Sequence, residues 1–99
     1  MISMKEYIER RSSKDMLIEY VSKVKALEIV KNRITELEKN IDALDEDIEE
    51  LEDTGLDRTV EILCKTRNSL NLERLELEIH ICKLRLWIAE FELERQLAK

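Results

Sequence analysis

Three side chains that could do chemistry lie close together in the sequence: Glu76, His80 and Cys82. Carboxylate, imidazole and thiolate groups bind metals and serve as acid, base and nucleophile. Their spacing fits neither role, because a di-iron helical bundle uses Glu-x-x-His, whereas three residues separate Glu76 from His80 and the chain has no second histidine. Cys82 also belongs to an apolar side of a predicted helix, away from His80. We therefore expect no enzyme, no metal and no cofactor.

The sharpest functional signal is an uneven distribution of charge. Residues 36–57, which we call the acidic tip, hold eleven carboxylates against the single cation Lys39, a local net charge of −10. Such a segment can steer a basic partner or imitate a phosphate backbone, but it is also typical of the solvated face of a coiled coil. The candidate partner-binding residues are Asp45, Glu46, Asp47, Glu49, Glu50 and Asp53.

Composition favours long helices. Of the 99 residues 40% are charged and 43% hydrophobic, and the chain has one glycine and no proline. The net charge of −6 argues against a general nucleic-acid binder, which needs clustered cations. The N-terminus has no hydrophobic signal core, and no apolar run approaches the roughly 20 residues that span a bilayer. We expect a soluble cytoplasmic protein that does not contact membranes and whose two cysteines are reduced thiols.

A heptad pattern predicts the first helix. Ser3 and Glu6 form a capping box, so the helix is expected over about 3–53, with Ser12 as the place where it could break. Its seam alternates intervals of three and four residues, as in a coiled coil. The seam residues are Leu27, Val30, Ile34, Leu37, Ile41, Leu44, Ile48 and Leu51.

The only glycine predicts the reversal of the chain. Gly55 accepts the left-handed conformation that ends a helix, which predicts a turn at 54–56. Asp57 can then cap a second helix over about 57–98. The expected fold is all-α, a long antiparallel helical hairpin of the coiled-coil type that makes 1–99 a single domain.

Reversal at this turn sets the register of the two helices. Tyr20 is expected near Phe91, and the remaining seam residues of the first helix align with one apolar stripe of the second. Arg67 and Arg74 interrupt that stripe, and we expect their aliphatic stems to cover leucine while their guanidinium groups reach outward to carboxylates.

The second helix carries another apolar stripe, about 170° from the first at about 100° per residue. This second stripe consists of Leu72, Leu75, Ile79, Cys82, Leu86, Ala89, Leu93 and Leu97. A hairpin offers only one neighbouring helix, and a contiguous exposed apolar patch marks an interaction surface. We therefore expect a homo-oligomer, in its simplest closure a dimer and alternatively a tetramer. In the dimer the open ends, residues of about 10–32 and 70–98, pack as a four-helix bundle. The candidate self-association residues are Leu72, Leu75, Ile79, Cys82, Leu86 and Leu93, with Ile18 and Val21 of the first helix.

Trp87 falls outside both stripes, on the polar side of the second helix. Tryptophan is enriched among binding hot spots, so Trp87 is a candidate contact residue. The alternative is that its ring packs over Leu84 and Phe91 at the edge of the bundle.

These patterns favour a non-enzymatic, homodimeric coiled-coil interaction module, an adaptor, regulator or inhibitor that presents its acidic tip to an unidentified protein partner. One alternative is an acidic mimic of nucleic acid that inhibits a nucleic-acid-binding enzyme. A second is a small helical-bundle nucleic-acid binder, which the net charge disfavours. The cations available for that role are Arg10, Arg11, Lys14, Lys23, Lys25 and Lys31.

Overall fold

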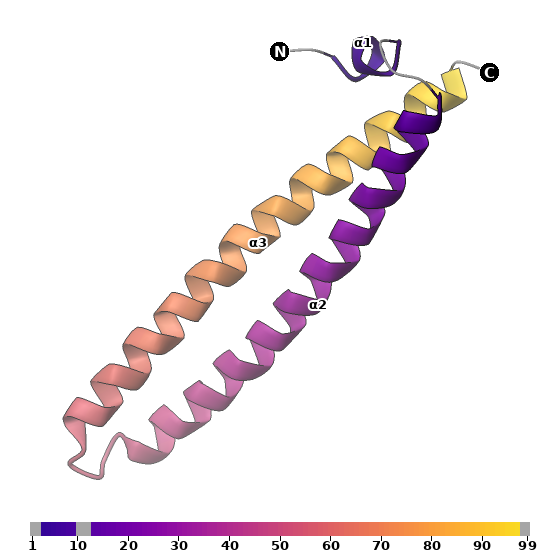
Figure 1. Ribbon diagram of the computed structural model, residues 1–99. Coiled ribbons are helices and arrows are strands. Elements are labelled where there is room, and N and C mark those ends of the chain that lie inside the picture. The colour runs from indigo at the N-terminus through magenta and orange to yellow at the C-terminus, as the bar shows by residue number, and fades with distance from the viewer. Residues whose placement is uncertain (1–2, 10–12, 98–99) are drawn as a thin grey trace. The chain divides into compact units, whose positions relative to one another are not determined.

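The computed structural model describes residues 3–9 and 13–97. Within them the chain folds into three helices, α1 (Met4–Glu9), α2 (Ser13–Leu51) and α3 (Asp57–Leu97), and no strand (Figure 1). The predicted all-α class and helical hairpin are confirmed.

The N-terminal part differs from the single helix predicted over about 3–53. The long helix α2 begins at Ser13, and Met4–Glu9 form the separate short helix α1. The predicted cap is confirmed, because the backbone N–H of Glu6 donates a 3.2 Å hydrogen bond to Ser3 Oγ. Ser12, the predicted breaking point, lies outside the described residues.

The turn between α2 and α3 is longer than predicted and begins earlier. α2 ends at Leu51 because Thr54 takes over the carbonyl of Leu51: its backbone N–H donates at 3.2 Å and its hydroxyl at 2.7 Å. Gly55 has a φ of 82°, the left-handed conformation that the sequence predicts. α3 begins at Asp57, as predicted.

The chain divides into two compact units. The terminal unit comprises Met1–Val30 and His80–Lys99, and the turn unit comprises Lys31–Ile79. Each contains a segment of α2 antiparallel to a segment of α3. The single domain over 1–99 stays a prediction.

In the turn unit the buried side chains all come from α2. They are Ile34, Leu37, Ile41 and Ile48, at the predicted seam positions. The α3 segment contributes half-buried leucines to the same core, among them Leu63, Leu70 and Leu77. Leu37 is completely buried, which makes it the best covered side chain of this unit.

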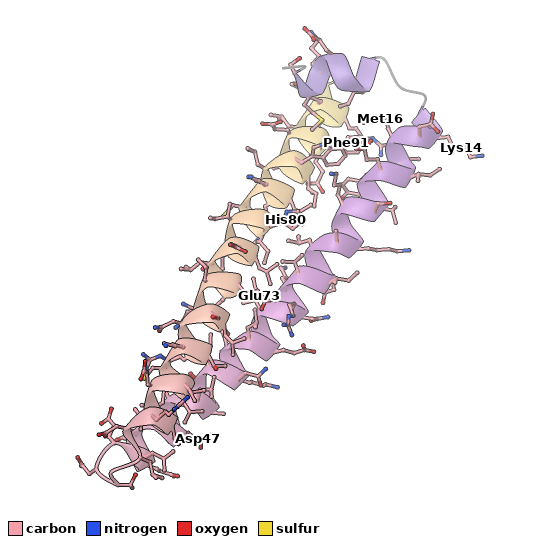
Figure 2. The ribbon with its side chains drawn as sticks, turned by 60° about the vertical axis from the view of Figure 1, so that its left-hand side comes forward. Lys14, Met16, Asp47, Glu73, His80 and Phe91 are labelled. Carbon is pink, nitrogen blue, oxygen red and sulfur yellow. The ribbon has the colours of Figure 1, made fainter. Side chains whose placement is uncertain are left out.

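In the terminal unit the core is formed by Met16 of α2 and by Ile81, Leu84 and Phe91 of α3. Met16 and Phe91 lie between the two helix segments, whereas Lys14 points outward (Figure 2). Tyr20 stacks on Phe91 with ring centroids 5.1 Å apart, which confirms the predicted register.

Candidate interaction surfaces

The predicted partner-binding residues of the acidic tip are all exposed. They lie in the last turns of α2 and in the turn that follows it. One of them, Asp45, also accepts a 3.2 Å hydrogen bond from Arg67 Nη1 of α3. The guanidinium group of Arg67 thus reaches outward to a carboxylate, as predicted. Asp45 is one of the eleven carboxylates of the acidic tip, so this contact leaves the tip strongly negative.

The second stripe is exposed in both units. In the turn unit Leu72, Leu75 and Ile79 keep 59%, 49% and 57% of their surface accessible. In the terminal unit Leu86 and Leu93 keep 61% and 55%, and Cys82 is exposed as well. The other stripe of α3 includes the buried Ile81, Leu84 and Phe91, so the chain covers one stripe of this helix and leaves the other open to solvent.

The α2 segment of the terminal unit also exposes apolar side chains. The two predicted self-association residues, Ile18 and Val21, are 56% and 46% accessible. Val24, at 41%, extends the same surface and was not among the predicted residues. It lies three residues after Val21 and seven after Leu17, so the helical spacing could have identified it.

Trp87 packs within the terminal unit and is half-buried. Its ring stacks on Phe91 with centroids 5.3 Å apart and an interplanar angle of 6°, and Lys23 Nζ lies 5.6 Å from its centroid. This is the packing on Phe91 that the sequence offered as the alternative to a hot spot. The exposed part of the ring leaves a contact role as a prediction.

Among the side chains that the structure describes, the rings of Tyr20 and Trp87 both stack on Phe91 and form an aromatic cluster with it. The hydroxyl of Tyr20 donates a 2.5 Å hydrogen bond to Glu92 Oε1 on α3. That hydrogen bond, aided by burial and by the negative charge of Glu92, raises the pKa of Tyr20 above its usual value of 10.0. The cluster therefore holds the two helix segments together by stacking and by a charge-assisted hydrogen bond.

An ion pair between α2 and α3 stands out in the turn unit. Arg33 Nη2 lies 3.1 Å from Glu73 Oε1, and Arg33 Nε donates to the same oxygen at 3.3 Å. The hydrogen bond to Glu73 raises the pKa of Arg33, so the guanidinium group stays charged. Both side chains are more than 40% accessible, so water and salt screen the pair.

Comparisons with protein-family models, curated proteins and solved structures give no match. None of the helices in the described part of the chain is both long enough and apolar enough to cross a membrane.

The reactive side chains do not assemble into a centre. His80 and Cys82 are exposed, and Cys64 is half-buried with a free thiol. Across residues 3–9 and 13–97, no three His, Cys, Asp or Glu side chains are grouped to hold a metal ion. Of the cations proposed for nucleic acid, Arg10 and Arg11 lie outside the described residues, and Lys23 is engaged with Trp87.

Proposed function

We propose that this protein is a non-enzymatic interaction module that works as a homodimer and presents its acidic tip to a macromolecular partner. The observation that carries the proposal is the exposure of the second stripe of α3, opposite the side that packs on α2. Exposed apolar stripes of this kind are unfavourable in water and are typical of interaction surfaces.

Dimerisation would cover the second stripe. Leucine and isoleucine side chains that are about half accessible gain on the order of 1 kcal/mol each when a neighbour removes them from water. Several such residues on one helix supply enough free energy to hold two small helical chains together. The two hairpins would then pack as a four-helix bundle with twofold symmetry.

The acidic tip provides the surface for a basic partner. Its predicted contact residues project into solvent, and Arg67 neutralises only Asp45 among them. Carboxylates grouped in this way accelerate the association of cationic proteins and favour them over anionic ones. A dimer carries two such tips and gains avidity for a partner with two sites.

Affinity capture from cell extract tests the role of the tip. The test variant neutralises Asp45, Glu46, Asp47, Glu49 and Glu50 as amides. The matched control neutralises five carboxylates elsewhere: Glu6, Glu19, Glu28, Glu61 and Glu94. We expect wild type and control to retain the same partners and the test variant to lose them. Equal retention by all three proteins would remove the tip from the proposed function.

The exposure of the tip also favours a second candidate, an acidic mimic that occupies the nucleic-acid groove of an enzyme. Ion pairs would then hold the partner, so a few tenths molar salt should release it, and DNA or RNA should compete for it. A captured partner that resists both treatments would exclude the mimic and retain the interaction module.

A further inference from the structure

The exposed side of α3 has the spacing of a coiled-coil seam. From Leu72 to Leu93 its apolar residues alternate intervals of three and four: Leu72, Leu75, Ile79, Cys82, Leu86, Ala89 and Leu93. In heptad terms Leu72, Ile79, Leu86 and Leu93 occupy the a positions, and Leu75, Cys82 and Ala89 the d positions. All seven side chains are exposed. A helix with this face is complementary to another helix with the same repeat.

Exposed charges flank the seam on both sides. The e positions on one side hold Glu76, Lys83 and Glu90, and the g positions on the other side hold Glu78, Arg85 and Glu92. Charges at these positions decide which helix pairs with which, and in which direction.

In a parallel pair of identical helices each g residue meets the e residue five positions later on the other helix. Arg85 of one copy then meets Glu90 of the other, and Glu78 meets Lys83. Twofold symmetry doubles both pairs, so four attractive contacts flank the seam. Every a and d residue of the seam contacts its equivalent in the other copy.

An antiparallel pair satisfies either the seam or the charges, but not both. When the seams overlap fully, e residues meet e residues and g residues meet g residues. Like charges then face each other between the two copies: Arg85 and Arg85, Lys83 and Lys83, and Glu78 and Glu92. A shift by one heptad restores opposite charges by placing Glu78 against Arg85, but it leaves Leu93 uncovered.

We propose that the second copy docks on α3 with its own α3, parallel and in register, so that Cys82 of one copy lies opposite Cys82 of the other. This inference rests on the proposed homodimer and names the helix, the face and the direction of its interface. Because that face lies opposite the side of α3 that packs on α2, the two α3 helices pair with each other and each α2 lies outside the pair, in place of a compact four-helix bundle. The a and d layers bury the second stripe, and the pairs Glu78–Lys83 and Arg85–Glu90 between copies select the parallel direction over the antiparallel one.

Cysteine cross-linking tests the register. Diamide takes two electrons and two protons from a pair of thiols, so that an S–S bond forms between them. In the parallel pair the two Cys82 thiols share one layer, whereas full antiparallel overlap separates them by four residues, about 6 Å along the helix axis in addition to the distance between helices. We expect Cys64→Ser, which retains Cys82, to give a covalent dimer within minutes, and the matched Cys82→Ser variant to give none.

Charge exchange tests the direction independently. Lys83→Glu should weaken dimerisation about tenfold, because two attractive pairs become repulsive. In the parallel pair the double variant Glu78→Lys, Lys83→Glu exchanges the charges and should restore the wild-type dimer. In the shifted antiparallel pair the same double variant would be weaker than Lys83→Glu alone, because the lysine introduced in place of Glu78 would then face Arg85. These substitutions change exposed side chains, and circular dichroism verifies that the helices are retained.

Sedimentation equilibrium of wild type and of the same variants distinguishes failure of the proposed homodimer from failure of the parallel pairing alone. A wild-type protein that is monomeric at every concentration overturns the homodimer itself. The parallel pairing alone is overturned if wild type is a dimer but two results fail. Those results are a covalent dimer of Cys64→Ser through Cys82, and tighter dimerisation of the double variant than of Lys83→Glu.

Discussion

Tyr20 of α2 donates its phenolic proton to Glu92 of α3 in a 2.5 Å hydrogen bond, while its ring stacks on the buried Phe91. Tyr20 thus fixes the register of the two helix segments in the terminal unit. It also determines which side of each segment faces the other. The hydrogen bond requires a protonated phenol, which gives the contact a pH dependence that can be measured.

We expect the pKa of Tyr20 to lie above the usual tyrosine value. The hydrogen bond to Glu92, burial and the carboxylate charge all favour the neutral phenol, although Arg95 opposes them. Because the folded-state pKa is raised, the stabilisation is fully present below the unfolded value of about 10 and is lost as the pH rises through the folded value. Absorbance titration of tyrosinate in a Tyr7→Phe background measures it, and Glu92→Gln should lower the pKa. A Tyr20 that ionises at or below the usual value contradicts the hydrogen bond.

The core of the turn unit depends on Leu37. Its side chain is completely buried, so Leu37→Ala should lower the free energy of unfolding by about 2–5 kcal/mol through lost burial and the cavity left behind. The matched control is Leu56→Ala. Leu56 is 51% accessible, so this substitution should lower the free energy of unfolding by less than about 1 kcal/mol. Urea unfolding at one protein concentration compares the two. Equal costs would show that the seam does not form the core of this unit.

The Arg33–Glu73 ion pair should contribute little to stability. Both side chains are more than 40% accessible, so a double-mutant cycle with Arg33→Ala and Glu73→Ala should give a coupling free energy close to zero. The coupling should shrink as salt is added, because salt screens exposed charges. A coupling well above the error of the measurement that salt does not change would indicate a pair shielded from solvent.

Gly55 should resist replacement for conformational reasons. Its φ of 82° lies in the left-handed region, and an added Cβ would have no atom within 4 Å. Gly55→Ala should therefore lower the free energy of unfolding by about 1–2 kcal/mol through backbone strain alone. Gly55→Asn should lower it by less, because asparagine tolerates this conformation better. Thermal unfolding of both variants measures the difference. An alanine variant as stable as wild type would mean that the turn adopts another conformation.

The sequence was sufficient to predict the parts of the fold that depend on local spacing. The α2 seam and the positive φ of Gly55 follow from helical periodicity and from the conformational freedom of glycine. The contact between Tyr20 and Phe91 then follows from where the chain reverses. The sequence favoured one helix over about 3–53 and named Ser12 only as the place where it could break, because the chain has no proline or glycine between Ser3 and Ser13 to mark the separation of α1 from α2.

The surfaces could be predicted only as far as helix geometry determines them. The exposure of Leu72 and Leu86 follows from their place opposite the covered stripe. The contacts of Arg33 with Glu73 and of Lys23 with Trp87 depend on the rotamers of long side chains, which periodicity does not determine. The partner that we propose for the acidic tip would be selected by complementary charge outside this chain, so no residue pattern within the chain names it.

The mass of the protein in solution, determined by light scattering over a dilution series, is the most direct test of the homodimer. We expect about twice the chain mass of 11.8 kDa for wild type and for Ile62→Glu, whose exposed side chain lies outside the second stripe. Leu86→Glu, which places a charge within that stripe, should reduce the mass to that of one chain. A wild-type protein that is fully helical at 11.8 kDa, at every concentration down from the millimolar range, would contradict the proposed assembly.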